Sequence, residues 1–104
     1  MDALKRLQDW YAAQCNGDWE HEYGVEIGTL DNPGWSLSID LAGTLLEHAG
    51  FDNISTLSPE SEWIDCRVEQ GRFEGRCGPK MLEEMIMVFI RWADAVPHRR
   101  GHDK

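Results

Sequence analysis

A period-two pattern on both sides of a Pro-Gly turn is the feature that most limits how this chain can fold. After the turn, apolar side chains recur at every second position, and they are Trp35, Leu37, Ile39 and Leu41. The same spacing precedes the turn over residues 23–29. Such alternation predicts strands with one apolar and one polar face. Between them, Pro33 suits the first central position of a type II turn and Gly34 the second, where φ is positive. The sequence therefore predicts an antiparallel hairpin.

A segment with a helical period follows near the C-terminus. It opens at Gly78-Pro79, where Pro suits the first turn of a helix. Its apolar stripe has i, i+3, i+4, i+7 spacing and comprises Leu82, Met85, Ile86, Phe89, Trp92, Ala93 and Val96. Met87 falls among charged positions of the same helix, so we expect it on the polar face. This helix should cover one side of the sheet.

The N-terminal segment predicts a second helix. Asp2 is a suitable N-cap, and Asn16-Gly17 is a stop signal after about Cys15. The predicted buried face carries Leu4, Leu7, Tyr11 and Cys15, with Trp10 beside it. Residues 18–22 then form a polar loop around one large aromatic side chain.

The rest of the chain supplies shorter strands. We expect a weak strand over 51–57, a turn over 58–62, a strand over 63–69 and a short strand around Phe73, with a loop over 44–50. The fold class is therefore α+β, an antiparallel sheet of four to five strands with an N-terminal and a C-terminal helix. Residues 1–96 are expected to form a single domain and residues 97–104 a flexible polar tail.

Charge limits the class of partner. The chain has 19 acidic and 10 basic side chains, a net charge of −9. Residues 1–96 hold 18 acids and 7 bases, which gives −11. Such a surface disfavours nucleic acid and suits a basic protein, because complementary charge accelerates association. Simple solubility is the alternative explanation.

The location expected from the sequence is the cytoplasm. The first residues show no basic start followed by an apolar run, and no stretch is long enough for a membrane span. The three cysteines, Cys15, Cys66 and Cys77, lack paired spacing and are interpreted as free thiols.

Motifs for catalysis are missing from the sequence. His21 is not part of HExxH, and no CxxC, GxGxxG or GKS motif is present. His98 and His102 have metal-like spacing without further ligands nearby. We therefore expect no enzymatic activity, no cofactor and no metal.

Acidic and aromatic side chains remain as candidate contacts. Asp18, Glu20, Glu22 and Asp31 are expected to gather at one end of the sheet, as a partner surface or as a solvated rim. Trp10, Trp35 and Trp92 are expected in the core. For Trp19 and Trp63 two alternatives stay open, core packing or a surface anchor for a partner.

Residues 10–44, which contain Trp19-Glu20 and Pro33-Gly34-Trp35, resemble the immunity protein 53 family of bacterial polymorphic toxin systems. That family is described by an α+β fold, a WE motif and a PGW motif. The similarity continues through Trp63–Glu69 and into the helix at Leu82.

The resemblance implies a protein that binds and neutralises a cognate toxin, and many such toxins are nucleases with basic clefts. The candidate contact residues are Asp18, Trp19, Glu20, Glu22, Asp31 and Trp35. A non-catalytic small-molecule or peptide-binding module is the alternative. A pocket lined by Trp19, Trp35 and Trp63 would favour the module, and an open acidic face would favour the toxin inhibitor. The oligomeric state stays open.

Overall fold

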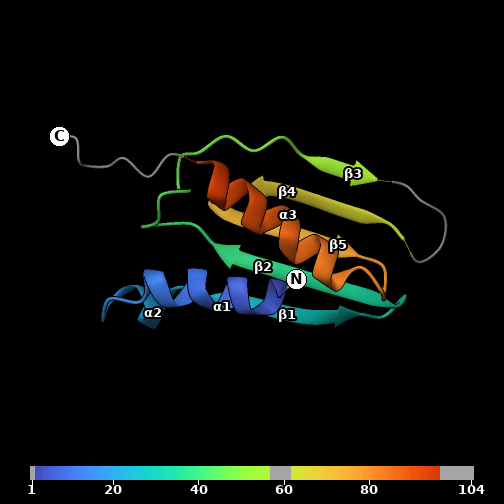
Figure 1. The fold of residues 1–104 in the computed structure, drawn as a ribbon, viewed down its shortest axis with the longest axis horizontal. Coiled ribbons are helices and arrows are strands. Elements are labelled where there is room, and N and C mark those ends of the chain that lie inside the picture. The colour runs from blue at the N-terminus through green and yellow to red at the C-terminus, as the bar shows by residue number, and fades with distance from the viewer. Residues whose placement is uncertain (1, 57–61, 97–104) are drawn as a thin grey trace.

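The computed structural model describes residues 2–56 and 62–96 as a two-layer α+β domain (Figure 1). Its elements are α1 (Ala3–Gln14), α2 (Trp19–Glu22), β1 (Val25–Leu30), β2 (Gly34–Asp40), β3 (Ile54–Thr56), β4 (Ile64–Glu69), β5 (Arg72–Cys77) and α3 (Leu82–Ala95). The five strands form one sheet in the order β1-β2-β5-β4-β3, and every neighbouring pair is antiparallel. Helices α1 and α3 cover the same face of this sheet (Figure 1). The predicted fold class is thereby confirmed, whereas the predicted tail, 97–104, lies outside the described residues.

The predicted hairpin is formed by β1 and β2. Ile27 pairs with Leu37 and Val25 with Ile39, so these four side chains share the helix-covered face. Leu37 and Ile39 are fully buried there. Their alternation with serines therefore follows the two environments of the sheet, a core on one side and an open polar surface on the other.

The glycine of the hairpin has a different role from the one predicted. Gly34 does not adopt a positive φ, in contrast to Gly17, Gly43 and Gly71. It is instead the first residue of β2, and a Cβ at this position would collide with the backbone carbonyl oxygen of Cys77 on β5. Close approach of two backbones, not turn geometry, makes glycine necessary here.

Aromatic rings form the centre of the core. Phe73 of β5 and Phe89 of α3 are fully buried, with ring centroids 5.2 Å apart. Trp10 of α1 packs edge-on against Phe89 at 4.9 Å, and Phe51 packs against Trp92 at 4.9 Å. Each such burial contributes about 1.5–3 kcal/mol from the hydrophobic effect. The expected shared core of β2 and α3 is confirmed, since Ile39 and Phe89 are both fully buried.

The first helix begins as predicted but turns a different face inward. The carboxylate of Asp2 accepts a hydrogen bond from the backbone N–H of Lys5 at 3.1 Å, so it caps α1. Ala3 and Leu7 are buried, whereas Leu4 is 58% exposed and Tyr11 38% exposed. The predicted stripe of Leu4, Leu7, Tyr11 and Cys15 was therefore wrong by part of a turn. The large ring of Trp10 fills the space next to Phe89, and this packing sets the rotation of α1 about its own axis.

Helix α3 buries one residue that the sequence predicts to be exposed. Met87 is only 6% exposed and belongs to the core cluster. It follows Glu83 by one turn and precedes Asp94 by two, and both of these residues border α1. α1 packs along α3, so α3 buries a second face in addition to the face on the sheet. The prediction for Met87 assumed contact with the sheet alone.

Candidate partner-binding surface

The predicted polar loop after α1 is a compact helical turn, α2, built by two side chains. The Oδ1 of Asn16 accepts hydrogen bonds from the backbone N–H groups of Asp18 at 2.9 Å and Trp19 at 3.0 Å. The carboxylate of Glu20 accepts from the backbone N–H groups of Asn16 at 2.9 Å and Gly17 at 2.8 Å. The two side chains thus satisfy four backbone donors that a chain reversal leaves unpaired. Glu20 is a structural residue of this turn.

The ionised form of Glu20 is favoured by these contacts. Backbone hydrogen bonds, first from its own N–H and then from those of Asn16 and Gly17, lower the pKa of Glu20 below its ordinary value. The carboxylate therefore stays charged and holds the turn at neutral pH. The neighbouring acids Asp18 and Glu22 make no comparable contacts among the described residues.

Trp19 packs inward from this turn. Its side chain is 6% exposed, and its indole N–H donates a 2.8 Å hydrogen bond to the carbonyl oxygen of Ala42. Its ring lies 6.2 Å from that of Trp10, 6.0 Å from that of Tyr11 and 6.1 Å from that of Tyr23. Of the two alternatives left open by the sequence, core packing is the one observed, and Trp19 is not an exposed anchor.

The six predicted contact residues divide between two ends of the sheet. Asp18, Trp19, Glu20 and Glu22 precede β1, whereas Asp31 and Trp35 lie at the turn that follows it. A six-residue strand separates its two ends by about 20 Å. The expected gathering of Asp31 with the other acids was therefore wrong, because residues that flank a strand on its two sides cannot meet.

Other acids take the place of Asp31. Asp40 ends β2, and its carboxylate accepts a 3.0 Å hydrogen bond from the backbone N–H of Gly24. Glu69 ends β4 at the hairpin whose Gly71 carbonyl accepts from the Leu41 N–H. Glu47 lies in the loop that packs on Trp19. We define the acidic end as Asp18, Glu20, Glu22, Asp40, Glu47 and Glu69. The sequence contains these residues, but their proximity follows from strand order and direction.

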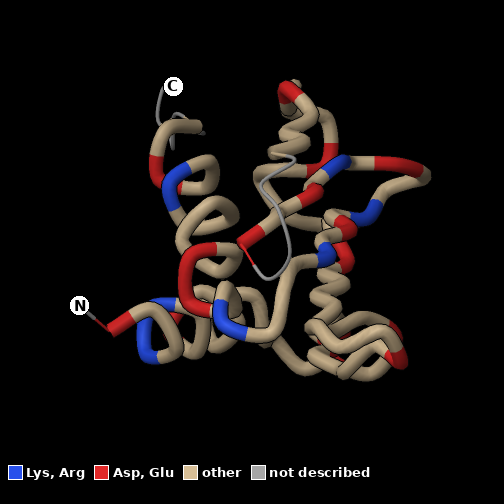
Figure 2. Tube along the Cα trace, turned by 90° about the vertical axis from the view of Figure 1, so that its right-hand side faces the viewer, with Lys and Arg blue, Asp and Glu red and all other residues tan. Residues whose placement is uncertain are grey.

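Basic side chains are distributed unevenly around this surface. Between Leu7 and Cys66 the chain has 12 acidic residues and no Lys or Arg. Among the described residues, Lys and Arg therefore lie on the first turns of α1, on β4, β5 and α3, and at position 80 before α3 (Figure 2). None lies on α2, β1 or β2. Arg72 borders the acidic end, but its guanidinium is occupied by Asp40 at 3.5 Å, Glu74 at 3.3 Å and Ser38 at 2.6 Å. At the acidic end Asp40 is thus paired with Arg72, and Glu69 with Arg67 at 3.6 Å. Asp18 and Glu22 have no ion-pair partner among the described residues.

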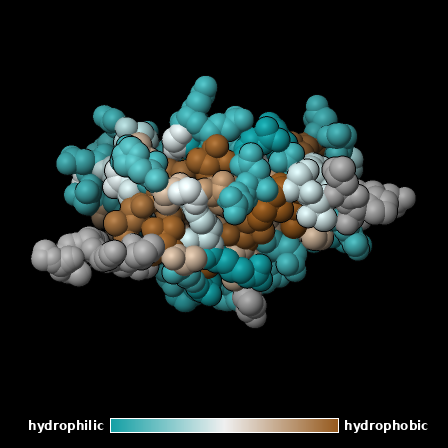
Figure 3. All heavy atoms as spheres, turned by 90° about the horizontal axis from the view of Figure 1, so that it is seen from above, coloured by the Kyte–Doolittle hydropathy of each residue, from teal (hydrophilic) through white to brown (hydrophobic). Residues whose placement is uncertain are grey.

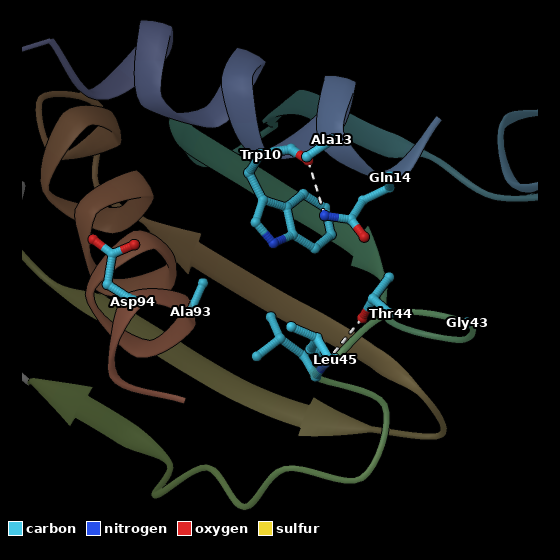
Figure 4. Close-up of a pocket in the computed structure, with 9 residues that line it drawn as sticks. Trp10, Ala13, Gln14, Gly43, Thr44, Leu45, Ala93 and Asp94 are labelled. Atoms are coloured by element: carbon cyan, nitrogen blue, oxygen red, sulfur yellow. Dashed lines mark hydrogen bonds between the residues drawn. The ribbon is translucent and has the colours of Figure 1, made fainter. Parts of the chain in front are cut away.

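A cleft of about 500 Å³ lies beside this end, between α1, α3 and the loop after β2 (Figure 4). Its lining residues are Trp10, Ala13, Gln14, Gly43, Thr44, Leu45, Leu46, Ala93 and Asp94. Several of its polar groups already have partners. The Gln14 amide donates to the Trp10 carbonyl, the Thr44 hydroxyl donates to the Leu41 carbonyl, and Asp94 pairs with Arg6. The lining does not include Trp19, Trp35 or Trp63. This cleft is therefore not the tryptophan-lined pocket that would favour a small-molecule module.

The two buried cysteines, Cys66 and Cys77, are poorly suited to nucleophilic chemistry. Burial, with a smaller contribution from Asp65, raises the pKa of the Cys66 thiol to about 12, and burial also raises the pKa of Cys77. Both thiols are therefore protonated and weakly nucleophilic. Across residues 2–56 and 62–96, no three His, Cys, Asp or Glu side chains lie close enough together to hold a metal ion. In the same ranges, none of the helices is both long and apolar enough to cross a membrane.

The structure is a small α+β domain with six acidic residues at one end of its sheet. A family model described as immunity protein 53 matches residues 4–94, and the chain belongs to this family. No curated protein and no solved structure matches the chain. Four residues of the two motifs have structural roles. Trp19 and Glu20 build the α2 turn, Gly34 permits backbone contact, and the Trp35 indole N–H donates to the Pro79 carbonyl at 3.0 Å.

Proposed function

We propose that this chain is a cytoplasmic immunity protein that binds and neutralises a cognate polymorphic toxin, and that the acidic end makes the contact. Membership of the immunity protein 53 family supports the first part of the proposal. The single observation that supports the second is the clustering of Asp18, Glu20, Glu22, Asp40, Glu47 and Glu69 at one end of the sheet, in a chain with a net charge of −9.

The physical mechanism follows from this charge. A basic toxin is drawn to the acidic end over a distance of about 10 Å at 0.1 M salt, the Debye length. Complementary fields raise the association rate and align the partners before contact. A nuclease cleft is basic because it binds phosphates, so an acidic domain seated in it would exclude the substrate by occupying the same charges. This action needs no catalytic group in the chain.

Different acids contribute in different ways. Asp18 and Glu22 are exposed, and their carboxylates accept no hydrogen bond from the backbone of the described residues. Their charge is therefore available to a partner. Glu20 is committed to Asn16 and Gly17, which fixes the turn that presents its neighbours. We therefore assign direct contact to Asp18 and Glu22 and a positioning role to Glu20 and Trp19.

The test uses the toxin domain encoded beside the gene for this chain. Production of that domain should arrest growth, and co-production of the immunity protein should restore it. The two proteins should also co-purify, with an association rate that falls as salt rises. Absence of both protection and complex formation with this toxin domain would contradict the proposal.

A small-molecule module remains the competing function for the cleft between α1 and α3. Thermal stabilisation by metabolites, without protection against the toxin domain, would favour it.

A further inference from the structure

One edge of the sheet offers unpaired backbone groups. β1 is the terminal strand of the sheet, with β2 on one side and no described strand on the other. The N–H of Asp40 donates to the carbonyl of Gly24, so these two residues form a hydrogen-bonded pair. Hydrogen-bonded and non-hydrogen-bonded pairs alternate along an antiparallel hairpin, and the next pair, Val25 with Ile39, is therefore of the second kind. The N–H and C=O groups of Val25, Ile27 and Thr29 therefore face away from β2.

An apolar surface lies along the same side of the molecule. The structure has five exposed large hydrophobic residues among those described, and three of them, Tyr11, Tyr23 and Ile27, belong to the end of α1 or to β1 and its approach. Tyr11 and Tyr23 both pack on Trp19, which brings the end of α1 to the start of β1. We call Tyr11, Tyr23 and Ile27 the β1 stripe.

The position of α1 explains this exposure. Ile27 is 39% exposed, whereas its cross-strand partner Leu37 is fully buried. Both side chains are on the helix-covered face of the sheet, and α1 packs along α3. The helix layer therefore ends before it covers β1 completely.

The edge also lacks the features that usually prevent strand addition. Edge strands are commonly protected by Lys, Pro, bulges or a covering segment. Residues 25–30 contain no Lys and no Pro, and their register with β2 is unbroken. Glu26, on the open face, and the flanking Glu22 and Asp31 are the nearby charges along the chain, and all are acidic.

We propose that β1 binds an extended segment of the toxin as a sixth strand of the sheet, and that this segment alternates apolar with basic side chains. Backbone groups of Val25, Ile27 and Thr29 would pair with the added strand, as in other cases of strand addition. Its apolar side chains would lie on the β1 stripe, and its Lys or Arg side chains would face Glu26. The inference rests on the proposed function and specifies how the partner is held.

A second copy of the chain is the less suitable occupant. Antiparallel pairing of two β1 strands would bring Glu22, Glu26 and Asp31 of one copy near those of the other, with no Lys or Arg on either strand. Like charges opposed in this way are destabilising.

The opposite edge, β3, also has apolar surface beside it, as seen from that side in Figure 3. Half-buried Ile54 lies in β3 and half-buried Phe51 just before it. β3 has only three residues, however, and is followed directly by residues outside the described ranges. β1 therefore offers the longer edge for strand addition.

The experiment compares Thr29→Pro with Thr29→Ala in binding to a catalytically inactive form of the toxin domain encoded beside this gene. Proline removes an outward N–H that β2 does not use and prevents a strand from pairing at that point. Alanine removes the same exposed side chain and keeps the N–H. We expect Thr29→Pro to weaken binding at least about tenfold, mainly through faster dissociation, and Thr29→Ala to change it less than about threefold.

A second measurement uses the unaltered chain and so does not depend on how the variant folds. Amide exchange in the complex should slow at Val25, Ile27 and Thr29. Glu26 and Gly28 should change less, because their N–H groups already point to β2. Equal binding by Thr29→Pro and Thr29→Ala, or unchanged exchange at the three outward amides, would overturn strand addition and leave the proposed function standing.

Two further outcomes also overturn the inference. If the toxin domain neither binds nor is neutralised by the unaltered chain, the proposed function fails and strand addition fails with it. If sedimentation shows a dimer of the free chain that Thr29→Pro disrupts, a second copy is the occupant of the edge.

Discussion

The two ends of β1 carry similar residues and use them differently. At the end that precedes the strand, Trp19 is buried and Glu20 is bound to backbone N–H groups. The Asp18 and Glu22 carboxylates have no hydrogen-bond partner within residues 2–56 and 62–96. At the turn that follows the strand, Trp35 is half-buried and donates to the Pro79 carbonyl, and the length of β1 separates Asp31 from the acidic end. A tryptophan next to carboxylates in the sequence therefore does not by itself indicate a buried or an exposed ring. Its role depends on which groups the fold places around it.

The largest contrast is expected from removing each tryptophan. Trp19→Ala should lower the free energy of unfolding by about 3–5 kcal/mol, because it empties a buried site and leaves the Ala42 carbonyl without its donor. Trp35→Ala should cost about 1–2 kcal/mol, since this ring is already partly in water. Urea unfolding followed by circular dichroism measures both values. Equal losses would show that the two ends are packed alike.

The next effect concerns the glycines at the same two ends. Gly34→Ala, at the turn end, should destabilise the fold by about 1–3 kcal/mol, because the new methyl group meets the Cys77 carbonyl. Gly24→Ala, at the acidic end, should stay within about 0.5 kcal/mol, because a Cβ there meets nothing within 4 Å. Thermal unfolding of the two variants checks this. A tolerated Gly34→Ala would mean that β2 and β5 can separate at low cost.

Charge reversal tests the functional difference directly. Asp18→Lys with Glu22→Lys should slow association with the toxin domain about tenfold at low salt, since both charges lie at the acidic end. Asp31→Lys with Asp65→Lys makes the same net change of charge away from that end and should slow association less than about threefold. Stopped-flow measurements at several salt concentrations give the rates. If the two pairs have equal effects, net charge matters and the acidic end has no special role.

The smallest effect is a pH dependence at Glu20. Its pKa is lowered in the folded chain from an ordinary value of 4.5 by backbone hydrogen bonds. Its contribution to stability is therefore present above about pH 4.5 and is lost as the pH falls through the folded-state value. Glu20→Gln should lower the melting temperature at pH 7, and the difference from the unaltered chain should shrink in acid.

Glu22→Gln is the matched control, because Glu22 accepts no backbone hydrogen bond among the described residues. It should leave the melting temperature nearly constant across the same pH range. A pH-independent difference for Glu20→Gln would show that its carboxylate charge does not hold the α2 turn.

Local patterns were sufficient for much of this fold. The period-two pattern around Pro33-Gly34 identified the β1–β2 hairpin and its buried face, and the stripe from Leu82 to Val96 identified α3. Asp2 identified the start of α1. These features depend on interactions between residues within a few positions of one another, and so the sequence displays them directly.

Tertiary structure decided the rest. Met87 is buried because α1 packs along α3, and Gly34 is required because β5 passes close to it. Asp40, Glu47 and Glu69 lie at the acidic end, because antiparallel strands in the order β1-β2-β5-β4-β3 return the chain repeatedly to the same end. Asp31 lies at the opposite end of β1. The sequence by itself determined an acidic α+β chain with its hairpin and helices. Which carboxylates share a surface depends on contacts between distant segments, and only the folded sheet determines those.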